Sequence, residues 1–163
     1  SMVRDCIVGK DTTVNASQVN ESTIGSHTTV GPFTYVRPNC RIGDHCRVGD
    51  FVEVKNSVIG DGTKISHLTY VGDSDVGQRV NFGCGTVTTN YDGHKKHRCT
   101  IGDDVFLGCN TNLIAPVTVA DRAYTAAGST VTDDVPEGAL AIARQRQTNI
   151  RGWADRLRKT WKK

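Results

Sequence analysis

Residues 22–54, STIGSHTTVGPFTYVRPNCRIGDHCRVGDFVEV, carry an aliphatic residue at every sixth position. Nineteen positions of the chain follow this spacing; glycine comes directly after eleven of them, and the residue two positions earlier is small or β-branched. The series is Val8, Val14, Ile24, Val30, Val36, Ile42, Val48, Val54, Ile59, Ile65, Val71, Val76, Phe82, Ile101, Leu107, Leu113, Val119, Thr125 and Val131.

A period of six fits neither common amphipathic pattern, since a helix repeats every 3.6 residues and a strand every two. Six-residue repeats with turn-forming glycine are typical of a parallel β-helix, in which short strands stack coil upon coil. The sequence therefore predicts an all-β parallel β-helix whose core is a column of stacked Val and Ile. Each coil is stabilised mainly by its neighbours, so the ends of the stack need caps.

The composition suits one globular domain, with 163 residues of which 37% are hydrophobic and 23% charged. No window approaches eighteen consecutive apolar residues, and the chain does not open on a basic segment followed by an apolar stretch. We therefore expect no membrane span, no signal peptide and a cytoplasmic location. Residues 1–2 (Ser-Met) are interpreted as a scar of tag removal, and residues 3–143 as the β-helix.

The segment 144–163 differs in charge from the rest of the chain. It holds eight Lys or Arg and a single acid, giving +7, whereas the other residues carry −4. Trp153, Leu157 and Trp161 are spaced by four and would share one face of a short helix. We predict a basic, helical or extended tail that caps the last coil. Such a charge could meet nucleic acid, a membrane surface or a phosphorylated ligand, with a merely solvated tail as the alternative. Without a basic groove interleaved with aromatic residues, nucleic acid is not an expected partner.

The six cysteines fall into two groups. Four occupy the small position of the repeat, which predicts core residues rather than disulfides or metal ligands: Cys6, Cys40, Cys46 and Cys99. Cys84 and Cys109 each lie two residues after a repeat residue instead. No Cys-x-x-Cys pair is present, and residues 94–99 only faintly resemble a zinc cluster, so we expect no metal site.

The repeat is interrupted at residues 88–98, TTNYDGHKKHR, which are polar, basic and turn-forming. An insertion leaves a solenoid as a loop, and such loops commonly form the wall of a binding site. A tolerated surface loop is the alternative. His67, Tyr70 and Asn81 fall on coils near the root of the loop, which favours a site.

Several segments resemble one family of bacterial enzymes, namely 52–56 (VEVKN), 67–73 (HLTYVGD), 90–93 (NYDG), 101–106 (IGDDVF) and 115–119 (APVTV). From about Gly31 to Trp153 the chain resembles the C-terminal half of the bifunctional N-acetylglucosamine-1-phosphate uridylyltransferase and glucosamine-1-phosphate acetyltransferase. The most specific motif is the pair HLTY and NYDG at this separation.

The resemblance implies a left-handed parallel β-helix that forms a homotrimer, with acetyl-CoA and glucosamine 1-phosphate meeting between subunits. The implied product is N-acetylglucosamine 1-phosphate, on the route to UDP-N-acetylglucosamine and the cell wall. The resemblance does not include the uridylyltransferase half, so we expect no nucleotidyl transfer by this chain. A true start at Met2 would indicate a stand-alone acetyltransferase.

Transfer of an acetyl group to a sugar amine requires an unprotonated amine, and histidine suits the role of general base because it titrates near neutral pH. The resemblance assigns this role to His67. His27 and His45 lie in ordinary repeats and are explained by an exposed face, whereas His94 and His97 on the loop are less favoured candidates.

The sugar phosphate is a dianion, for which Lys and Arg provide strong charge-assisted hydrogen bonds. Arg37 and Lys55 match the family's phosphate-binding residues, and each stands after a repeat residue where glycine is usual. This departure favours a site independently, with plain surface charge as the alternative. Tyr70 and Asn81 match residues that hold the sugar, and Lys96 is expected to reach the phosphate from the loop.

The residues that match acetyl-CoA contacts in the family are Asn90, Tyr91, Ala127 and Arg144. The backbone N–H of Cys84 is a candidate donor to the thioester oxygen as negative charge develops there. Cys109 stands where many relatives have Ser, and a thiol is a poorer hydrogen-bonding partner than a hydroxyl. No covalent acetyl-cysteine is expected.

The leading hypothesis is therefore direct acetyl transfer in a ternary complex, without a metal and without contact with a membrane. The first alternative is acyl transfer of the same class to another amine or hydroxyl acceptor. The second is a zinc-dependent hydratase of the carbonic-anhydrase type, which would need three His on the metal. The third is a non-catalytic scaffold or trimerisation stalk.

Overall fold

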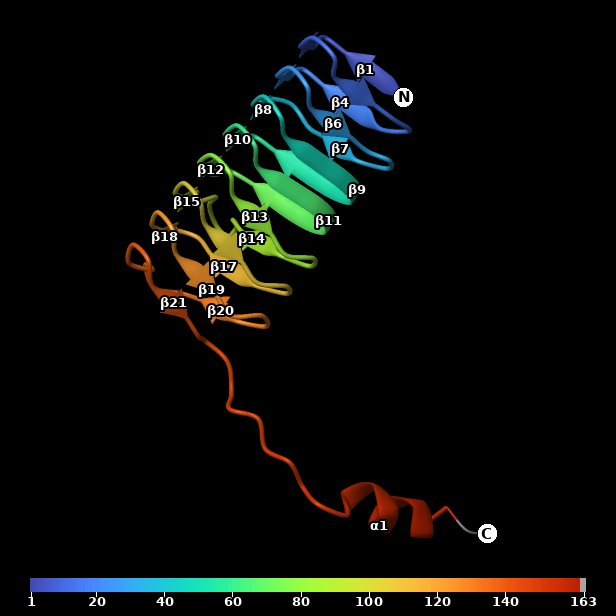
Figure 1. Ribbon diagram of the computed structural model, residues 1–163, viewed down its shortest axis with the longest axis vertical. Helices are drawn as coiled ribbons and strands as arrows, with labels where there is room; N and C mark the ends of the chain where they lie inside the picture. Colours follow the sequence, from blue (N-terminus) through green and yellow to red (C-terminus); the bar gives the residue numbers. More distant parts are fainter. Residues whose placement is uncertain (162–163) are drawn as a thin grey trace.

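The computed structural model describes residues 1–161 and consists of a parallel β-helix of about eight turns, an extended segment and one short helix (Figure 1). Strands of successive coils pair in parallel, as in the series Tyr35↔Glu53, Glu53↔Tyr70, Tyr70↔Val87 and Val87↔Asn112. The predicted all-β solenoid is confirmed.

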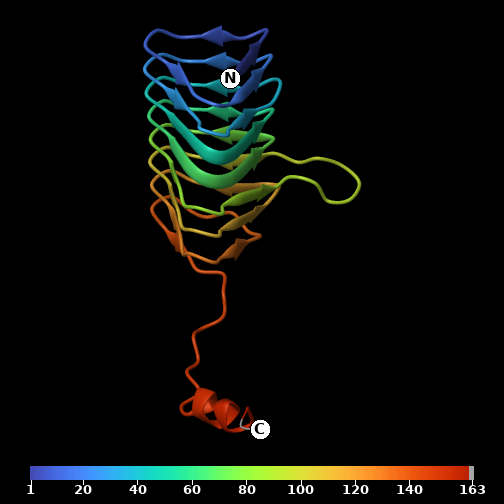
Figure 2. The same cartoon turned by 90° about the vertical axis from the view of Figure 1, so that its right-hand side faces the viewer.

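Each coil contributes one short strand to each of three faces (Figure 2). Face 1 holds β1 (Met2–Arg4), β4 (Gln18–Asn20), β7 (Tyr35–Val36), the ends of β9 (Arg47–Lys55) and β11 (Lys64–Gly72), β14 (Val87–Thr89), β17 (Asn112–Ile114) and β20 (Thr130–Val131). Face 2 holds β2 (Ile7–Val8), β5 (Thr23–Ile24), β8 (Arg41–Ile42), β10 (Val58–Ile59), β12 (Ser74–Val76), β15 (Cys99–Ile101) and β18 (Val117–Val119). Face 3 holds β3 (Thr13–Val14), β6 (Thr29–Val30), the beginnings of β9 and β11, β13 (Asn81–Phe82), β16 (Phe106–Leu107), β19 (Tyr124–Thr125) and β21 (Leu140–Ala141).

The three faces meet at three corners, which we name for their residues. Face 3 turns into face 1 at the histidine corner, which contains Asp50, His67, Cys84, Cys109 and Ala127. Face 1 turns into face 2 at the loop corner, which contains Asn39, Asn56, Asp73 and residues 90–98. Face 2 turns into face 3 at the aspartate corner, which contains Asp44, Asp61, Asp103 and Asp121.

The core is the predicted column of repeat residues. Ile65, Val71, Leu107 and Leu113 are fully buried, and Thr125 lies in the same column with its hydroxyl 2.9 Å from that of Thr111. The exception is at the open N-terminal end, where Val8 is exposed because no earlier coil covers it. Burying each large aliphatic side chain in such a column contributes about 1.5–3 kcal/mol.

The small position of the repeat has a second purpose beyond fitting the interior. The hydroxyl of Thr28 donates to the carbonyl of Gly43 (2.9 Å) and accepts from the backbone N–H of Cys46 (3.0 Å), one coil further on. Ser57 is bonded in the same way to the backbone N–H of Ser74 (3.0 Å). These side chains therefore satisfy backbone groups that the turns leave unpaired in the buried interior.

The cysteines lie as predicted. Cys40, Cys46 and Cys99 are buried, Cys6 is partly buried in the first coil, and Cys84 and Cys109 are exposed. All six are free thiols.

The predicted cap at the C-terminus is wrong. After β21 the chain leaves the stack as an extended segment and then forms α1 (Trp153–Lys159), which lies away from the coils (Figure 1). Trp153, Leu157 and Trp161 do form the apolar part of this helical end, but all three are exposed because no other part of residues 1–161 covers them. Lys162 and Lys163, the last residues of the predicted tail, lie outside the described residues. No helix among residues 1–161 has the length and apolar character needed to cross a membrane.

Two residues of β11 test the assignment of the core. Ile65 is fully buried and Leu68, three residues later on the histidine corner, is 59% exposed. Replacement of Ile65 by Ala is expected to lower the free energy of unfolding by about 2–5 kcal/mol, because it leaves a cavity in the column. Leu68→Ala is expected to change it by less than about 0.5 kcal/mol. Urea denaturation measures both, and similar losses in the two variants would contradict the assignment.

Candidate functional site

Four predicted site residues lie on the histidine corner, one in each of four successive coils. The register on face 3 pairs Ile65 with Phe82, Phe82 with Leu107 and Leu107 with Thr125. The residues two positions after these four are His67, Cys84, Cys109 and Ala127. They therefore form one column along the edge of the solenoid.

Arg144 extends this column past the last coil. The carbonyl of Ala143 accepts from the backbone N–H of Thr130 (3.1 Å), and the Arg144 side chain passes beside Gly128. Because Gly128 directly follows Ala127, Arg144 lies at the lower end of the histidine corner. A cation is thus placed at the end of a column that begins with an imidazole.

The side chain of His67 is half-exposed, and its Nδ1 lies 3.7 Å from Oδ1 of Asp50 on the preceding coil. This separation is longer than a hydrogen bond, so the carboxylate is a neighbour of the ring rather than a bonded partner.

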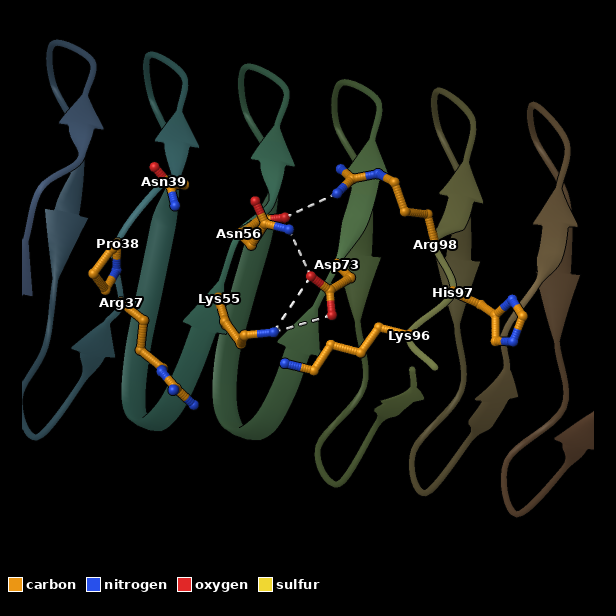
Figure 3. A pocket seen from close by; sticks show the side chains of 9 residues that line it. All are labelled: Arg37, Pro38, Asn39, Lys55, Asn56, Asp73, Lys96, His97 and Arg98. Atoms are coloured by element: carbon orange, nitrogen blue, oxygen red, sulfur yellow. Dashed lines mark hydrogen bonds and ion pairs between the residues drawn. The ribbon is translucent and has the colours of Figure 1, made fainter. Parts of the chain in front are cut away.

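A cationic cleft of about 540 Å³ lies on face 1 and the loop corner (Figure 3). Arg37 and Lys55 reach it from neighbouring coils, and Lys96 enters from the inserted loop. Arg37 NH1 is 3.0 Å from Glu53 Oε1. The cleft collects three of the predicted phosphate-binding side chains in one place.

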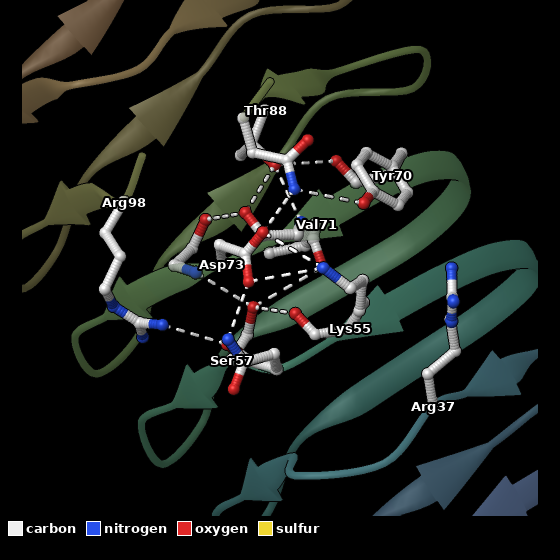
Figure 4. A network of polar contacts seen from close by, with 12 residues as sticks. Arg37, Lys55, Ser57, Tyr70, Val71, Asp73, Thr88 and Arg98 are labelled. Carbon is white, nitrogen blue, oxygen red and sulfur yellow. Dashed lines mark hydrogen bonds and ion pairs between the residues drawn. The ribbon is translucent and has the colours of Figure 1, made fainter. Parts of the chain in front are cut away.

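A buried carboxylate at the loop corner organises this cleft (Figure 4). Asp73 is 4% exposed; its Oδ2 accepts from Lys55 Nζ at 3.1 Å and from Asn90 Nδ2 at 2.5 Å, and its Oδ1 accepts from Asn56 Nδ2 at 2.6 Å. Asn90 also donates to the Tyr70 hydroxyl at 3.3 Å. Burial opposes the charge of Asp73, but the hydrogen bonds from Asn56, Asn90 and Lys55 outweigh it and hold its pKa below the usual range.

The two lysines of the cleft influence each other. The neighbouring Lys55 lowers the pKa of Lys96, both by direct contact and by charge repulsion. Burial acts to lower the pKa of Lys55, but its contacts with Lys96 and Asp73 outweigh burial and raise it. The cleft therefore brings together cations whose mutual repulsion a bound anion would reduce.

The inserted loop projects sideways from the stack (Figure 2). It leaves the coil after Thr89 rather than at residue 88, since Val87–Thr89 form β14. An isolated bridge joins Tyr91 to Lys96, and Asp92 accepts from His97 Nε2 at 2.7 Å. At its end, Arg98 is bonded twice to Asp75 (2.9 and 2.7 Å) and once to the carbonyl of Asn56 (3.1 Å).

The remaining predicted residues lie apart from one another. Asn81 is on face 3, next to Lys64 and Phe106, whereas the cationic cleft is on face 1. Tyr91 is exposed on the loop, its hydroxyl bonded to the carbonyl of Gly93 (2.8 Å). One chain alone therefore does not bring Asn81 into the cleft.

Three site residues were not predicted, namely Asn56, Asp73 and Arg98. Asp73 ends the HLTYVGD segment, and Arg98 directly precedes Cys99, where the repeat resumes. Arg98 ends the interruption in the repeat, which is the signal that points to it, whereas Asp73 lies one coil earlier and carries no such signal. Among residues 1–161, no group of three or more His, Cys, Asp or Glu is placed to hold a metal ion.

Comparison with known proteins agrees with this geometry. The model for "Bacterial transferase hexapeptide (six repeats)" matches residues 21–56 and 98–133, on either side of the loop. These two stretches carry the hexapeptide repeat of that family model. The gap between the two matches, residues 57–97, includes the inserted loop and the repeat residues from Ile59 to Phe82.

The hexapeptide-repeat domain is similar to one part of larger proteins. It is 62% identical over 159 residues to the "Bifunctional protein GlmU" of Oceanobacillus iheyensis, covering 98% of this chain and 35% of that protein. The protein of the same name from Clostridium perfringens is 59% identical over 149 residues, covering 91% of this chain and 33% of that protein. The chain thus spans about a third of the length of these relatives.

Among solved structures, the domain is similar to a mutant GDP-perosamine N-acetyl transferase from Caulobacter crescentus in complex with CoA and GDP-perosamine. The two are 26% identical with a TM-score of 0.64, and the match covers 71% of this chain and 53% of that chain.

The charge of Asp73 gives a pH-dependent contribution to stability. Its pKa is lowered in the folded state, so the contribution is present above the unfolded value of about 3.9 and is lost as the pH falls through the folded value. Asp73→Asn is expected to lower the free energy of unfolding by about 2 kcal/mol at pH 7.

This difference from the wild type is expected to shrink as the pH falls below about 4. Urea denaturation between pH 7 and pH 3 measures this difference. Asp5→Asn is the control, because Asp5 is exposed and, like Asp73, has a positive φ. A difference that stays constant or grows in acid would contradict the assigned role of Asp73.

Proposed function

We propose that this domain transfers the acetyl group of acetyl-CoA to the amine of glucosamine 1-phosphate, giving N-acetylglucosamine 1-phosphate. The observation that carries the proposal is the placement of a cationic cleft and an exposed imidazole on the two sides of one face. The relatives named bifunctional protein GlmU, and an N-acetyl transferase bound to CoA and an amino sugar nucleotide, support it.

The cleft supplies the charge that a sugar phosphate needs. Arg37 and Lys55 each already contact one carboxylate, whereas Lys96 forms no ion pair with a carboxylate within residues 1–161. A phosphate dianion bound in the cleft would therefore contact three cations, of which only two already have a carboxylate partner. Tyr70, bonded to Asn90 on the same face, is placed to hold the sugar between the cleft and the histidine corner.

At the histidine corner, the imidazole of His67 takes a proton from the sugar amine while the amine nitrogen attacks the thioester carbonyl of acetyl-CoA. The nitrogen–carbon bond forms, the carbon–sulfur bond breaks, and the thiolate of coenzyme A leaves. Asp50 is the acidic neighbour of this ring, with its carboxylate 3.7 Å from Nδ1. General base catalysis of this kind contributes typically 10²–10⁴-fold.

The acetyl group is placed one coil further along the same corner. Within residues 1–161 the backbone N–H of Cys84 donates to no carbonyl, so it is free to bind the thioester oxygen as charge develops. Cys109, Ala127 and Arg144 continue the column, with Arg144 serving the phosphates of coenzyme A. Asn90 and Tyr91 would contact the cofactor from the loop corner.

A second copy of the chain completes the site in this proposal, as part of a homotrimer. Asn81 lies on face 3, away from the cleft of its own chain. The same face exposes the stacked rings of Phe106 and Tyr124, whose centroids are 5.2 Å apart, together with Leu140. Contact between this apolar surface and face 1 of a neighbour would bring Asn81 to the cleft.

Replacement of the proposed base tests the mechanism. His67→Ala is expected to lower kcat for acetyl transfer by at least about 100-fold with the fold unchanged. His45→Ala is the matched control, because His45 stacks on His27 at the aspartate corner, a different edge of the solenoid. Near-normal turnover in the first variant, or an equal loss in both, would remove His67 from this role.

The cationic cleft gives a separate prediction. Arg37→Ala is expected to raise KM for glucosamine 1-phosphate by about tenfold or more, since it removes a charge-assisted hydrogen bond. KM for acetyl-CoA is expected to change by less than about twofold. Arg79→Ala, which breaks an exposed ion pair with Asp104 at another corner, is the control. A rise confined to the KM of acetyl-CoA would place the phosphate elsewhere.

A further inference from the structure

Cys84 and Cys109 occupy the same position in two successive coils. Each residue from 81 to 89 corresponds to the residue 25 positions later, as the pairs Phe82↔Leu107 and Val87↔Asn112 on both sides of the corner show. At the corner itself, Asn110 N donates to the carbonyl of Cys84 at 2.8 Å. The two residues therefore lie one above the other on the histidine corner, each with an exposed thiol.

These two thiols differ chemically from the other cysteines. Cys84 and Cys109 are exposed, whereas Cys40, Cys46 and Cys99 are buried. Burial raises the pKa of the Cys40 and Cys46 thiols, and that of Cys99 to about 11. Since the thiolate is the form that binds metals, the buried thiols are unreactive near neutral pH.

The spacing of the coils suits a bridging ion. Neighbouring strands of a sheet lie about 4.8 Å apart, so equivalent side chains that point the same way have their ends at a similar separation. Two metal–sulfur bonds of about 2.3 Å in a line span about 4.6 Å. A disulfide requires Cβ atoms about 3.8 Å apart, so it would need the two coils to approach each other at this corner.

We propose that Cys84 and Cys109 bind one Cu(I) ion between them as two thiolates. Thiolate ligands select soft cations, of which Cu(I) accepts linear coordination by two sulfurs. Because residues 1–161 hold no group of three or more His, Cys, Asp or Glu placed for a metal, the pair suits a two-coordinate ion rather than tetrahedral zinc.

Binding changes no oxidation state. Each thiol loses one proton to solvent, two copper–sulfur bonds form, and copper remains Cu(I). The bound ion would lie one coil from His67, at the place proposed for the acetyl group. Occupancy would therefore block acetyl transfer, a consequence that rests on the proposed function, whereas binding itself does not.

The test is an anaerobic titration of the protein with Cu(I), in competition with the chromophoric chelator bicinchoninate. The wild type is expected to bind one ion per chain. Cys84→Ala and Cys109→Ala are each expected to weaken this binding by about 100-fold or more, because the second thiolate acts at high effective concentration. Cys6→Ala, which removes the partly buried thiol of the first coil, is expected to leave the affinity unchanged.

The variants are expected to fold, since both thiols are exposed and alanine already occupies the next position of the column at Ala127. Far-UV circular dichroism checks this. Wild-type affinity in either single variant would overturn the proposal. The proposal would also be overturned if the protein stayed free of copper and its mass fell by two hydrogens, which marks a disulfide between Cys84 and Cys109.

Discussion

The in-register stacking of parallel coils is the constraint on which the rest of the structure depends. Because backbone hydrogen bonds link each coil to the next at fixed positions, residues 16 to 18 apart in the sequence, or 25 apart across the inserted loop, lie directly above one another. The column of Val and Ile, the hydroxyl bridges of Thr28 and Ser57 and the histidine corner all follow from that register. The candidate site therefore extends along edges of the solenoid rather than into a cavity between layers.

The cationic cleft is stabilised by a buried carboxylate rather than by neutralisation of each cation. Asp73 fixes Lys55 and Asn90, and Arg98 attaches the returning end of the loop to Asp75, so that Lys96 enters beside Lys55. These contacts keep Lys55 and Lys96 close together in the folded protein in spite of the repulsion between their charges. A dianionic ligand would relieve this repulsion, which supports the proposal of a phosphorylated substrate.

Much of this architecture was accessible from the sequence. The six-residue period identified the core, the three buried cysteines and the interruption, and the substitution of Gly by Arg37 and Lys55 marked face 1 as unusual. Asp73 was missed because aspartate is common at solenoid corners, and only its contacts with Lys55 and Asn90 distinguish it. The spacing of Trp153 and Leu157 correctly indicated a helix, but amphipathic spacing does not specify what covers the apolar side.

The most direct test compares acetyl transfer from acetyl-CoA to glucosamine 1-phosphate and to unphosphorylated glucosamine. If the cleft and the histidine corner form one site for a phosphorylated amino sugar, kcat/KM is at least about 100-fold higher for the phosphate, the effect of about two charge-assisted hydrogen bonds. Equal rates for the two sugars, or no transfer to either, would contradict the account.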